Sequence, residues 1–156
     1  MVICKDCHYL PFVCKLNSFY RLSEKWAEKI LHPKSRVEKL GVKSAMQVSL
    51  IGKFDDDFRK ELGSATKNVS AGKITVNSEL IFVGIESAAG LGDVAKIAKS
   101  VRGAAGIWIV YPKGKKEITE TDVIGAGRKA GLKDVKVVGF SPTRTALKFV
   151  LPADKR

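Results

Sequence analysis

The sequence predicts an α/β fold: a mostly parallel sheet of about five strands, with the last strand antiparallel and helices on both faces. Strand-like apolar runs recur along the chain, at 46–51, 80–85, 106–111, 135–140 and 146–151. The runs Leu80–Val83 and Ile107–Val110 are apolar throughout, which is typical of strands covered by helices on both faces. Only residues 141–145 separate the last two strands. A parallel crossover needs a dozen or more residues, so the final strand must reverse.

Residues 1–38 are expected to form an irregular extension and an amphipathic helix, ahead of an α/β domain over 39–156. The helix is predicted over 18–31, where large apolar residues recur at helical spacing. These residues are Phe19, Leu22, Trp26 and Ile30. Such a stripe normally packs against a neighbouring surface, so we expect Trp26 to contact the α/β domain or a second copy of the chain.

Three further helices are predicted between the strands, at 55–62, 92–101 and 119–130. The last of these begins at a Thr119 cap and ends at Gly131, a residue that commonly stops helices. The segment 63–79 is polar and offers only a weak strand, at 73–76.

The charge of the chain favours anionic partners. Its 156 residues include 28 lysines and arginines against 16 acidic residues, giving a net charge of +12 and a pI near 9.7. Nucleic acid, a phosphorylated small molecule and an acidic protein surface all suit this balance, and a solvated lysine surface explains it equally well. No recognition motif supports nucleic acid. No apolar run is long enough to span a membrane, and no signal peptide is visible, so the expected location is cytoplasmic.

The cysteines all lie near the start of the chain, at Cys4, Cys7 and Cys14. Cys4, Cys7 and His8 match the C-x-x-C-H pattern of covalent haem attachment, and with Cys14 they offer four zinc ligands. Haem attachment normally follows export, and adjacent Cys7 and His8 fit one tetrahedral site poorly. We therefore predict thiols without a role, and no metal or cofactor.

The first predicted strand leads into a turn that lacks the usual phosphate-binding glycines. A G-x-G-x-x-G loop works because glycines let the backbone approach a phosphate. Here a single glycine, Gly52, is followed by Lys53, Phe54 and three aspartates. Asp55–Asp57 either bind a hard cation or complement a helix dipole, and the dipole is the favoured interpretation.

A ligand crevice is expected at the carboxyl ends of the strands, where open α/β sheets bind their ligands. The candidate ligand-binding residues at these ends are Lys53, Asp55, Glu86, Ser87, Tyr111, Lys113, Lys115, Lys116 and Ser141. The lysines would make the crevice cationic, with Arg144 nearby, unless they form only a solvated loop. No catalytic residue is predicted, because every histidine and cysteine precedes the α/β domain and no Walker loop or nucleophile elbow occurs.

Two segments resemble the class I methyltransferase fold, a Rossmann-like α/β fold. They are Gly106–Lys113, similar to its G-G-x-x-W-v-x-x-P strand, and Gly131–Val138, similar to its a-G-L-x-d-v-k-v segment. The whole of 39–151 resembles a family of small bacterial proteins of unknown function, described as truncated methyltransferase-like domains. The matching stretches are Lys39–Lys43, Val48–Gly52, Tyr111–Lys116 and Ala146–Val150.

The resemblance implies a methyltransferase-like fold that is cut down on one side. Only about 28 residues (52–79) lie between the first two long strands, where that fold normally has two more strands with helices. The missing part is the half that holds the adenosine ribose. No acidic residue ends a second strand to bind the ribose hydroxyls.

Taken together, the lost glycine turn and the shortened half favour a non-catalytic binding or regulatory module for an anionic ligand or partner. The sequence does not decide whether the chain is an enzyme, but it leans against one. The alternative is an S-adenosylmethionine-dependent methyltransferase with a degenerate cofactor loop. A nucleic-acid-binding protein is the second alternative.

Overall fold

The computed structural model describes residues 26–27, 30–31 and 33–156, and the chain divides into two compact units at Ser35/Arg36. Most of the predicted helix over 18–31 lies outside the described residues, as does the whole irregular extension. The candidate haem or zinc ligands there also fall outside them: Cys4, Cys7, His8 and Cys14. The second unit, 36–156, contains the whole sheet.

The described part of the N-terminal helix exposes large apolar side chains. Trp26 is 66% exposed, Ile30 79% and Leu31 73%. Because apolar surface is driven out of water, we propose that a second copy of the chain covers this stripe. Trp26→Ala is expected to shift sedimentation velocity from dimer toward monomer, whereas Lys34→Ala is expected to change nothing. A wild-type chain that sediments as a monomer up to millimolar concentration would contradict this proposal.

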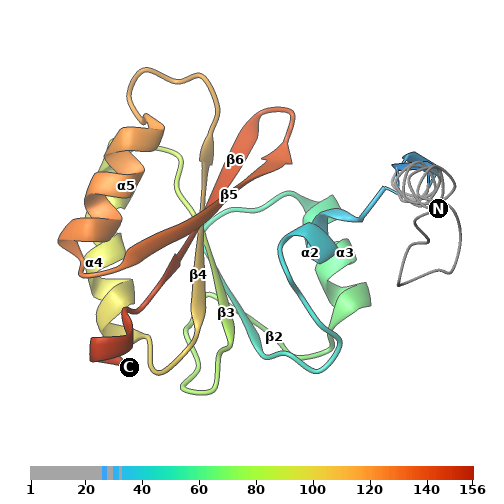
Figure 1. The fold of residues 1–156 in the computed structure, drawn as a ribbon, viewed down its shortest axis with the longest axis horizontal. Coiled ribbons are helices and arrows are strands. Elements are labelled where there is room, and N and C mark those ends of the chain that lie inside the picture. Colours follow the sequence, from blue (N-terminus) through green and yellow to red (C-terminus); the bar gives the residue numbers. More distant parts are fainter. Residues whose placement is uncertain (1–25, 28–29, 32) are drawn as a thin grey trace, which may run out of the picture. The chain divides into compact units, whose positions relative to one another are not determined.

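Six strands form one sheet in the order β2-β1-β3-β4-β6-β5 (Figure 1). The strands are β1 (Val48–Ile51), β2 (Val69–Ala71), β3 (Leu80–Gly84), β4 (Gly106–Pro112), β5 (Lys133–Ser141) and β6 (Arg144–Val150). Strand β1 pairs in parallel with β2 and β3, and β3 pairs in parallel with β4. Strand β6 runs antiparallel to both of its neighbours, β4 and β5. The predicted reversal of the last strand is therefore confirmed.

Helices cover both faces of this sheet, as predicted. The helices of the α/β unit are α2 (Arg36–Lys39), α3 (Asp56–Ala65), α4 (Leu91–Ser100) and α5 (Glu120–Lys129), with short 3-10 turns η1 (Ala88–Gly90) and η2 (Ala153–Lys155). Figure 1 shows α4 and α5 on one side of the sheet and α2 and α3 on the other. Thr119 caps α5 in a reciprocal capping box with Asp122, and Gly131 follows the helix with a φ of +80°.

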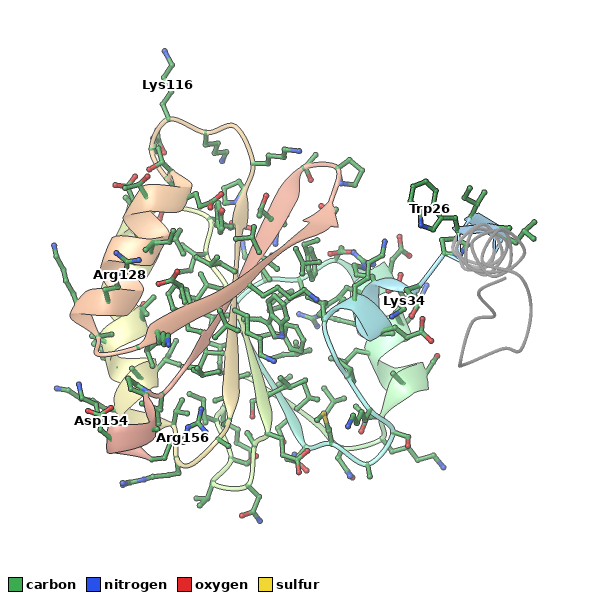
Figure 2. The ribbon with its side chains drawn as sticks, viewed as in Figure 1. Trp26, Lys34, Lys116, Arg128, Asp154 and Arg156 are labelled. Carbon is green, nitrogen blue, oxygen red and sulfur yellow. The ribbon has the colours of Figure 1, made fainter. Side chains whose placement is uncertain are left out.

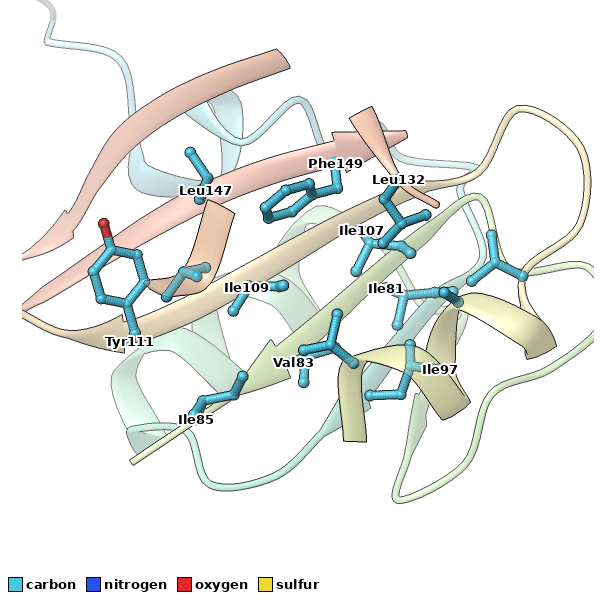
Figure 3. Close-up of a cluster of buried hydrophobic side chains, with 14 of the residues drawn as sticks. Ile81, Val83, Ile85, Ile97, Ile107, Ile109, Tyr111, Leu132, Leu147 and Phe149 are labelled. Carbon is cyan, nitrogen blue, oxygen red and sulfur yellow. The ribbon is translucent and has the colours of Figure 1, made fainter. Parts of the chain in front are cut away.

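The central strands are buried on both faces because their side chains alternate between two apolar layers. Ile107 and Ile109 of β4 belong to the layer beneath α4 and α5, with Phe149 of β6 (Figure 3). Trp108 and Val110 belong to the layer beneath α2 and α3. This arrangement explains the continuous apolar runs in the sequence.

Trp108 also ties the segment before β1 to the sheet. Its indole Nε1 donates to the carbonyl oxygen of Leu40 at 3.1 Å, and the indole is 1% exposed. A buried indole N–H needs such an acceptor, since an unpaired donor in the core is costly. The bond fixes Leu40 and Gly41 against the face of β4.

The weak strand that the sequence places at 73–76 lies instead at Val69–Ala71, as β2. Residues after β2 return to β3 through a loop held by hydroxyl groups. Ser78 bonds both the buried Ser49 of β1 and Thr75, the latter at 2.7 Å. Among the described residues, no helix is both long and apolar enough to cross a membrane.

Candidate functional site

The carboxyl ends of β1, β3 and β4 lie at one edge of the sheet because these strands are parallel. Strand β6 begins at the same edge because it is reversed, and its first residue, Arg144, is in register with Pro112 at the end of β4. We call this region the carboxyl edge. It comprises residues 52–55, 84–87, 111–113 and 141–144.

Two glycines bring the loop after β1 directly against the end of β3. Gly52 has a φ of +91°, and a Cβ placed on it would lie 2.5 Å from the carbonyl oxygen of Gly84. A Cβ on Gly84 would lie 2.7 Å from the carbonyl oxygen of Lys53. Real Cβ atoms do not approach a backbone this closely, so glycine is required at both positions. The single glycine of the first turn therefore allows two backbone segments, the turn after β1 and the end of β3, to pack against each other.

Arg144, at the start of the reversed strand β6, bridges the ends of β1 and β3. Its Nη1 donates to the carbonyl oxygen of Lys53 at 3.1 Å, and its Nη2 to Glu86 Oε1 at 3.1 Å. The side chain of Arg144 is 23% exposed and that of Glu86 is 52% exposed. A planar guanidinium, whose separate nitrogen atoms can each donate to a different acceptor, suits this two-armed contact. The structure thus places a cation and a carboxylate together at the carboxyl edge.

Lys113 and Ser141 lie beside the same arginine. The backbone N–H of Lys113 donates to the carbonyl oxygen of Thr143 at 2.7 Å. The Ser141 hydroxyl is 3.3 Å from that of Thr143 and accepts from its backbone N–H. The segments after β1 and β4, predicted to meet through Lys53 and Lys113, are therefore joined by the turn that carries Arg144.

Asp55 is directed away from this cluster, to the face covered by α2 and α3. Its carboxylate accepts from the backbone N–H of Phe58, as the N-cap of α3, and from Arg36 Nη1 at 3.0 Å. Partial burial raises the pKa of Asp55, but hydrogen bonds from its own backbone N–H, from Arg36 and from Phe58, together with the Arg36 charge, outweigh it and hold the pKa below its usual value. The stability this carboxylate contributes is present above its ordinary pKa of 3.8 and fades as the pH falls below it. The helix-start interpretation of the aspartates is the one the structure supports.

The remaining candidates occupy three different environments. Tyr111 is 4% exposed and packs in the layer beneath α4 and α5 (Figure 3). Burial, and then the charge of Glu120, raises the pKa of its phenol, so Tyr111 stays a neutral hydroxyl near pH 7. Lys115 and Lys116 are exposed in the loop between β4 and α5, and Figure 2 shows Lys116 pointing away from the sheet. Ser87 precedes η1 and makes no capping bond.

Sequence reasoning missed Gly84 and left Arg144 outside the predicted site residues. The sequence signal for Arg144 was partial: the short segment before the last strand requires the chain to reverse, but it does not say that the reversed strand pairs with β4. Gly84 carried no such signal, since its need for glycine comes from Lys53, 31 positions earlier in the sequence. In the described part of the chain, no cluster of three or more His, Cys, Asp or Glu side chains forms a metal site.

The carboxyl edge offers charges that suit an amino acid, but among the described residues it lacks a carboxylate directly after β2 that would bind the ribose of a nucleoside. Glu86 and Arg144 are complementary to the ammonium and carboxylate of an amino acid. On the nucleoside side, β2 ends at Ala71 and is followed by Gly72 and Lys73, without a carboxylate over the described residues 69–75. One strand, β2, lies on this side of β1, where the resemblance implies two.

No protein-family model matches the chain, and no curated protein matches it in sequence. Solved structures match its fold. An S-adenosylmethionine-dependent methyltransferase from Aquifex aeolicus aligns with a TM-score of 0.58 at 15% identity, covering 74% of this chain and 87% of that one. A putative methyltransferase from Thermoplasma acidophilum aligns at 0.55 and 9% identity, covering 73% and 71%. The N-methyltransferase NodS from Bradyrhizobium japonicum WM9, in complex with S-adenosylhomocysteine, aligns at 0.52 and 13% identity, covering 75% and 85%.

These neighbours correct the main functional prediction. The expectation of a non-catalytic binding or regulatory module is wrong, because the matched structures are consistently methyltransferases and favour the alternative drawn from the same sequence. At these identities the likeness establishes the fold, not the activity. The chain has the Rossmann-like fold of the class I S-adenosylmethionine-dependent methyltransferases.

Proposed function

We propose that this chain binds S-adenosylmethionine at its carboxyl edge and transfers the methyl group to an acceptor. The observation that carries the proposal is the sheet order β2-β1-β3-β4-β6-β5 with β6 reversed, on which methyltransferase structures superpose. In open α/β sheets of this kind the ligand lies outside the carboxyl ends of the strands. In this chain that edge carries Arg144, Glu86 and the close-packed Gly52 turn.

Arg144 and Glu86 are the residues that would hold the methionyl end of the cofactor. In the structure they neutralise each other at 3.1 Å. An amino acid zwitterion offers each of them an opposite charge, so the carboxylate would pair with the guanidinium and the ammonium with Glu86. S-adenosylmethionine, when bound, supplies an electrophilic methyl group on a sulfonium centre. The protein's part would be to orient that end and to hold the acceptor beside it.

Affinity is expected to be modest because the ribose lacks a carboxylate partner at the end of β2. We expect a Kd for S-adenosylhomocysteine of roughly 100 μM, about −5.5 kcal/mol. Methylthioadenosine, which lacks the amino acid part, should bind about tenfold more weakly to the wild-type chain. Isothermal titration calorimetry of the two ligands measures both values.

The variant that tests the binding mode is Arg144→Gln. It should lower the affinity for S-adenosylhomocysteine and abolish the preference over methylthioadenosine. Arg128→Gln is the matched control. Arg128 also pairs with a carboxylate, that of Asp134, but it lies on α5, away from the carboxyl edge. If neither ligand shows heat or a thermal shift at millimolar concentration, the chain does not bind the cofactor and the proposal fails.

Transfer itself requires a separate measurement. S-adenosylmethionine with a labelled methyl group would be incubated with the protein and fractionated cell extracts, and label would be followed into small molecules and macromolecules. Incorporation should require the wild-type chain and be reduced by Arg144→Gln. Binding without incorporation in any fraction would contradict the transfer step while leaving the binding site intact.

A further inference from the structure

A cavity lies at the opposite edge of the sheet, at the amino ends of the parallel strands. Its volume is about 480 Å³, which is the size of a small-molecule site. Met46 precedes β1, Leu80 and Gly106 begin β3 and β4, and Val150 ends β6. None of these residues belongs to the carboxyl edge, so the cavity is independent of the proposed cofactor site.

Lys148 of β6 provides a cation in this cavity. Its Nζ lies 5.7 Å from the centre of the Trp108 ring, within reach of a cation–π contact. It forms no ion pair or hydrogen bond with the described residues, although its side chain is half-buried. A half-buried ammonium without a carboxylate is a suitable partner for an anion.

Gly106, which is in register with Val150 two residues after Lys148, leaves room for the lysine side chain. A Cβ on Gly106 would come within 3.0 Å of Lys148 Cε and 3.1 Å of Leu80 Cδ2. Without that Cβ the end of the lysine side chain lies close over Gly106. A larger residue at 106 would push the stem aside.

The rest of the lining combines a second cation with apolar surface. Arg102 lies on the exposed loop after α4 and lines the same cavity. Val76 is 84% exposed and stands on the rim, where a bound molecule would cover it. Asn77 and Ser78 add polar groups, and Glu79 adds one negative charge, so Arg102 and Lys148 leave the lining with a net positive charge.

We propose that this cavity, the amino-edge cavity, binds a small organic anion. Its acidic group would pair with Lys148 and Arg102, and its apolar body would lie over Val76 and Leu80. A carboxylate, sulfonate or phosphate monoester would meet the charge requirement equally. This site does not depend on methyl transfer or on cofactor binding at the other edge.

The test uses 8-anilinonaphthalene-1-sulfonate, an anion with a flat apolar body whose fluorescence rises in apolar surroundings. The full chain should bind it, and N-phenyl-1-naphthylamine, the neutral analogue, should bind about tenfold more weakly, a difference of about 1.4 kcal/mol. Amide NMR shifts should move at Ser78, Arg102 and Gly106. Saturating S-adenosylhomocysteine should not displace the dye.

Matched substitutions distinguish dye binding in the cavity from dye binding to the general positive charge of the chain. Lys148→Gln should weaken dye binding about tenfold, whereas Lys136→Gln should leave it unchanged, since Lys136 is in register with Lys148 on β5 and does not line the cavity. Val76→Ala should weaken binding, and Val137→Ala, at another exposed valine, should not. Arg102→Gln provides a second charge variant on an exposed loop if Lys148→Gln fails to fold.

Three results would overturn the proposal. Equal effects of Lys148→Gln and Lys136→Gln would show binding by general charge. Equal affinity for the anionic and neutral dyes would remove the role of the cations. Displacement by S-adenosylhomocysteine, or NMR shifts confined to the carboxyl edge, would place the dye at the other site.

Discussion

Replacing Gly52 with alanine is expected to lower the free energy of unfolding by roughly 3 kcal/mol or more. The φ of +91° is one cost, because an L side chain is strained there by about 1–2 kcal/mol. The second cost is steric. The new Cβ would meet the carbonyl oxygen of Gly84 at 2.5 Å, and this is backbone held in the β3 ladder, so it cannot rotate away. Relieving the contact must separate the first turn from β3.

The matched control for this effect is Gly72→Ala. Gly72 also has a positive φ, of +77°, but a Cβ added there would have no atom within 4 Å of it. Its expected loss is only the conformational part, about 1 kcal/mol. Urea unfolding followed by circular dichroism measures both losses. Equal losses for the two variants would show that the contact between Gly52 and Gly84 contributes nothing to stability.

Replacing Phe58 with alanine is expected to cost roughly 3–5 kcal/mol of unfolding free energy. Phe58 is fully buried where α3 meets the sheet. Its ring centre lies 5.3 Å from that of Phe82 and 4.7 Å from that of Phe140, both edge-on. The Arg36 guanidinium lies 5.2 Å from the same ring. Removing the ring leaves a cavity and takes a partner from each of these three groups.

Phe58→Leu separates the effect of the cavity from the effect of the lost aromatic contacts. Leucine fills much of the space, so the expected loss is about 1.5 kcal/mol. The same urea titrations compare the two variants, with the denaturant slope checked for constancy. If leucine and alanine destabilise the protein equally, aromatic contact and not cavity formation dominates at this position.

The strands could be predicted from the sequence where burial on both faces requires a continuous run of apolar residues. Leu80–Val83 and Ile107–Val110 lie on central strands, and a side chain on either face of such a strand meets a helix layer. The reversal of β6 followed from the length of one turn. Strand β2 was not predicted at its observed position, because Val69–Ala71 is only three residues long and lies at the sheet edge, where half-exposed positions need not be apolar.

The candidate site could be predicted only in outline. The rule about carboxyl ends predicts which segments meet at one edge of the sheet, because it depends on strand direction alone, and the ends of β1, β3 and β4 do meet there. It could not tell that Asp55 would cap α3 and pair with Arg36, 19 positions earlier. Nor could it find the pairing of Gly52 with Gly84 or the two arms of Arg144. Each of these contacts exists only once distant segments are folded together.

The place of β6 between β4 and β5 has a consequence for the order of folding. Strand β5 pairs with β6 alone, so it cannot join the sheet until β6 has formed. A hairpin made of neighbouring segments assembles early, because little chain entropy is lost in closing its turn. We therefore expect residues 133–150 to dock on β4 as a preassembled unit. Until they emerge from the ribosome, one edge of β4 has no pairing partner, and we expect the incomplete chain to be prone to aggregation at this stage.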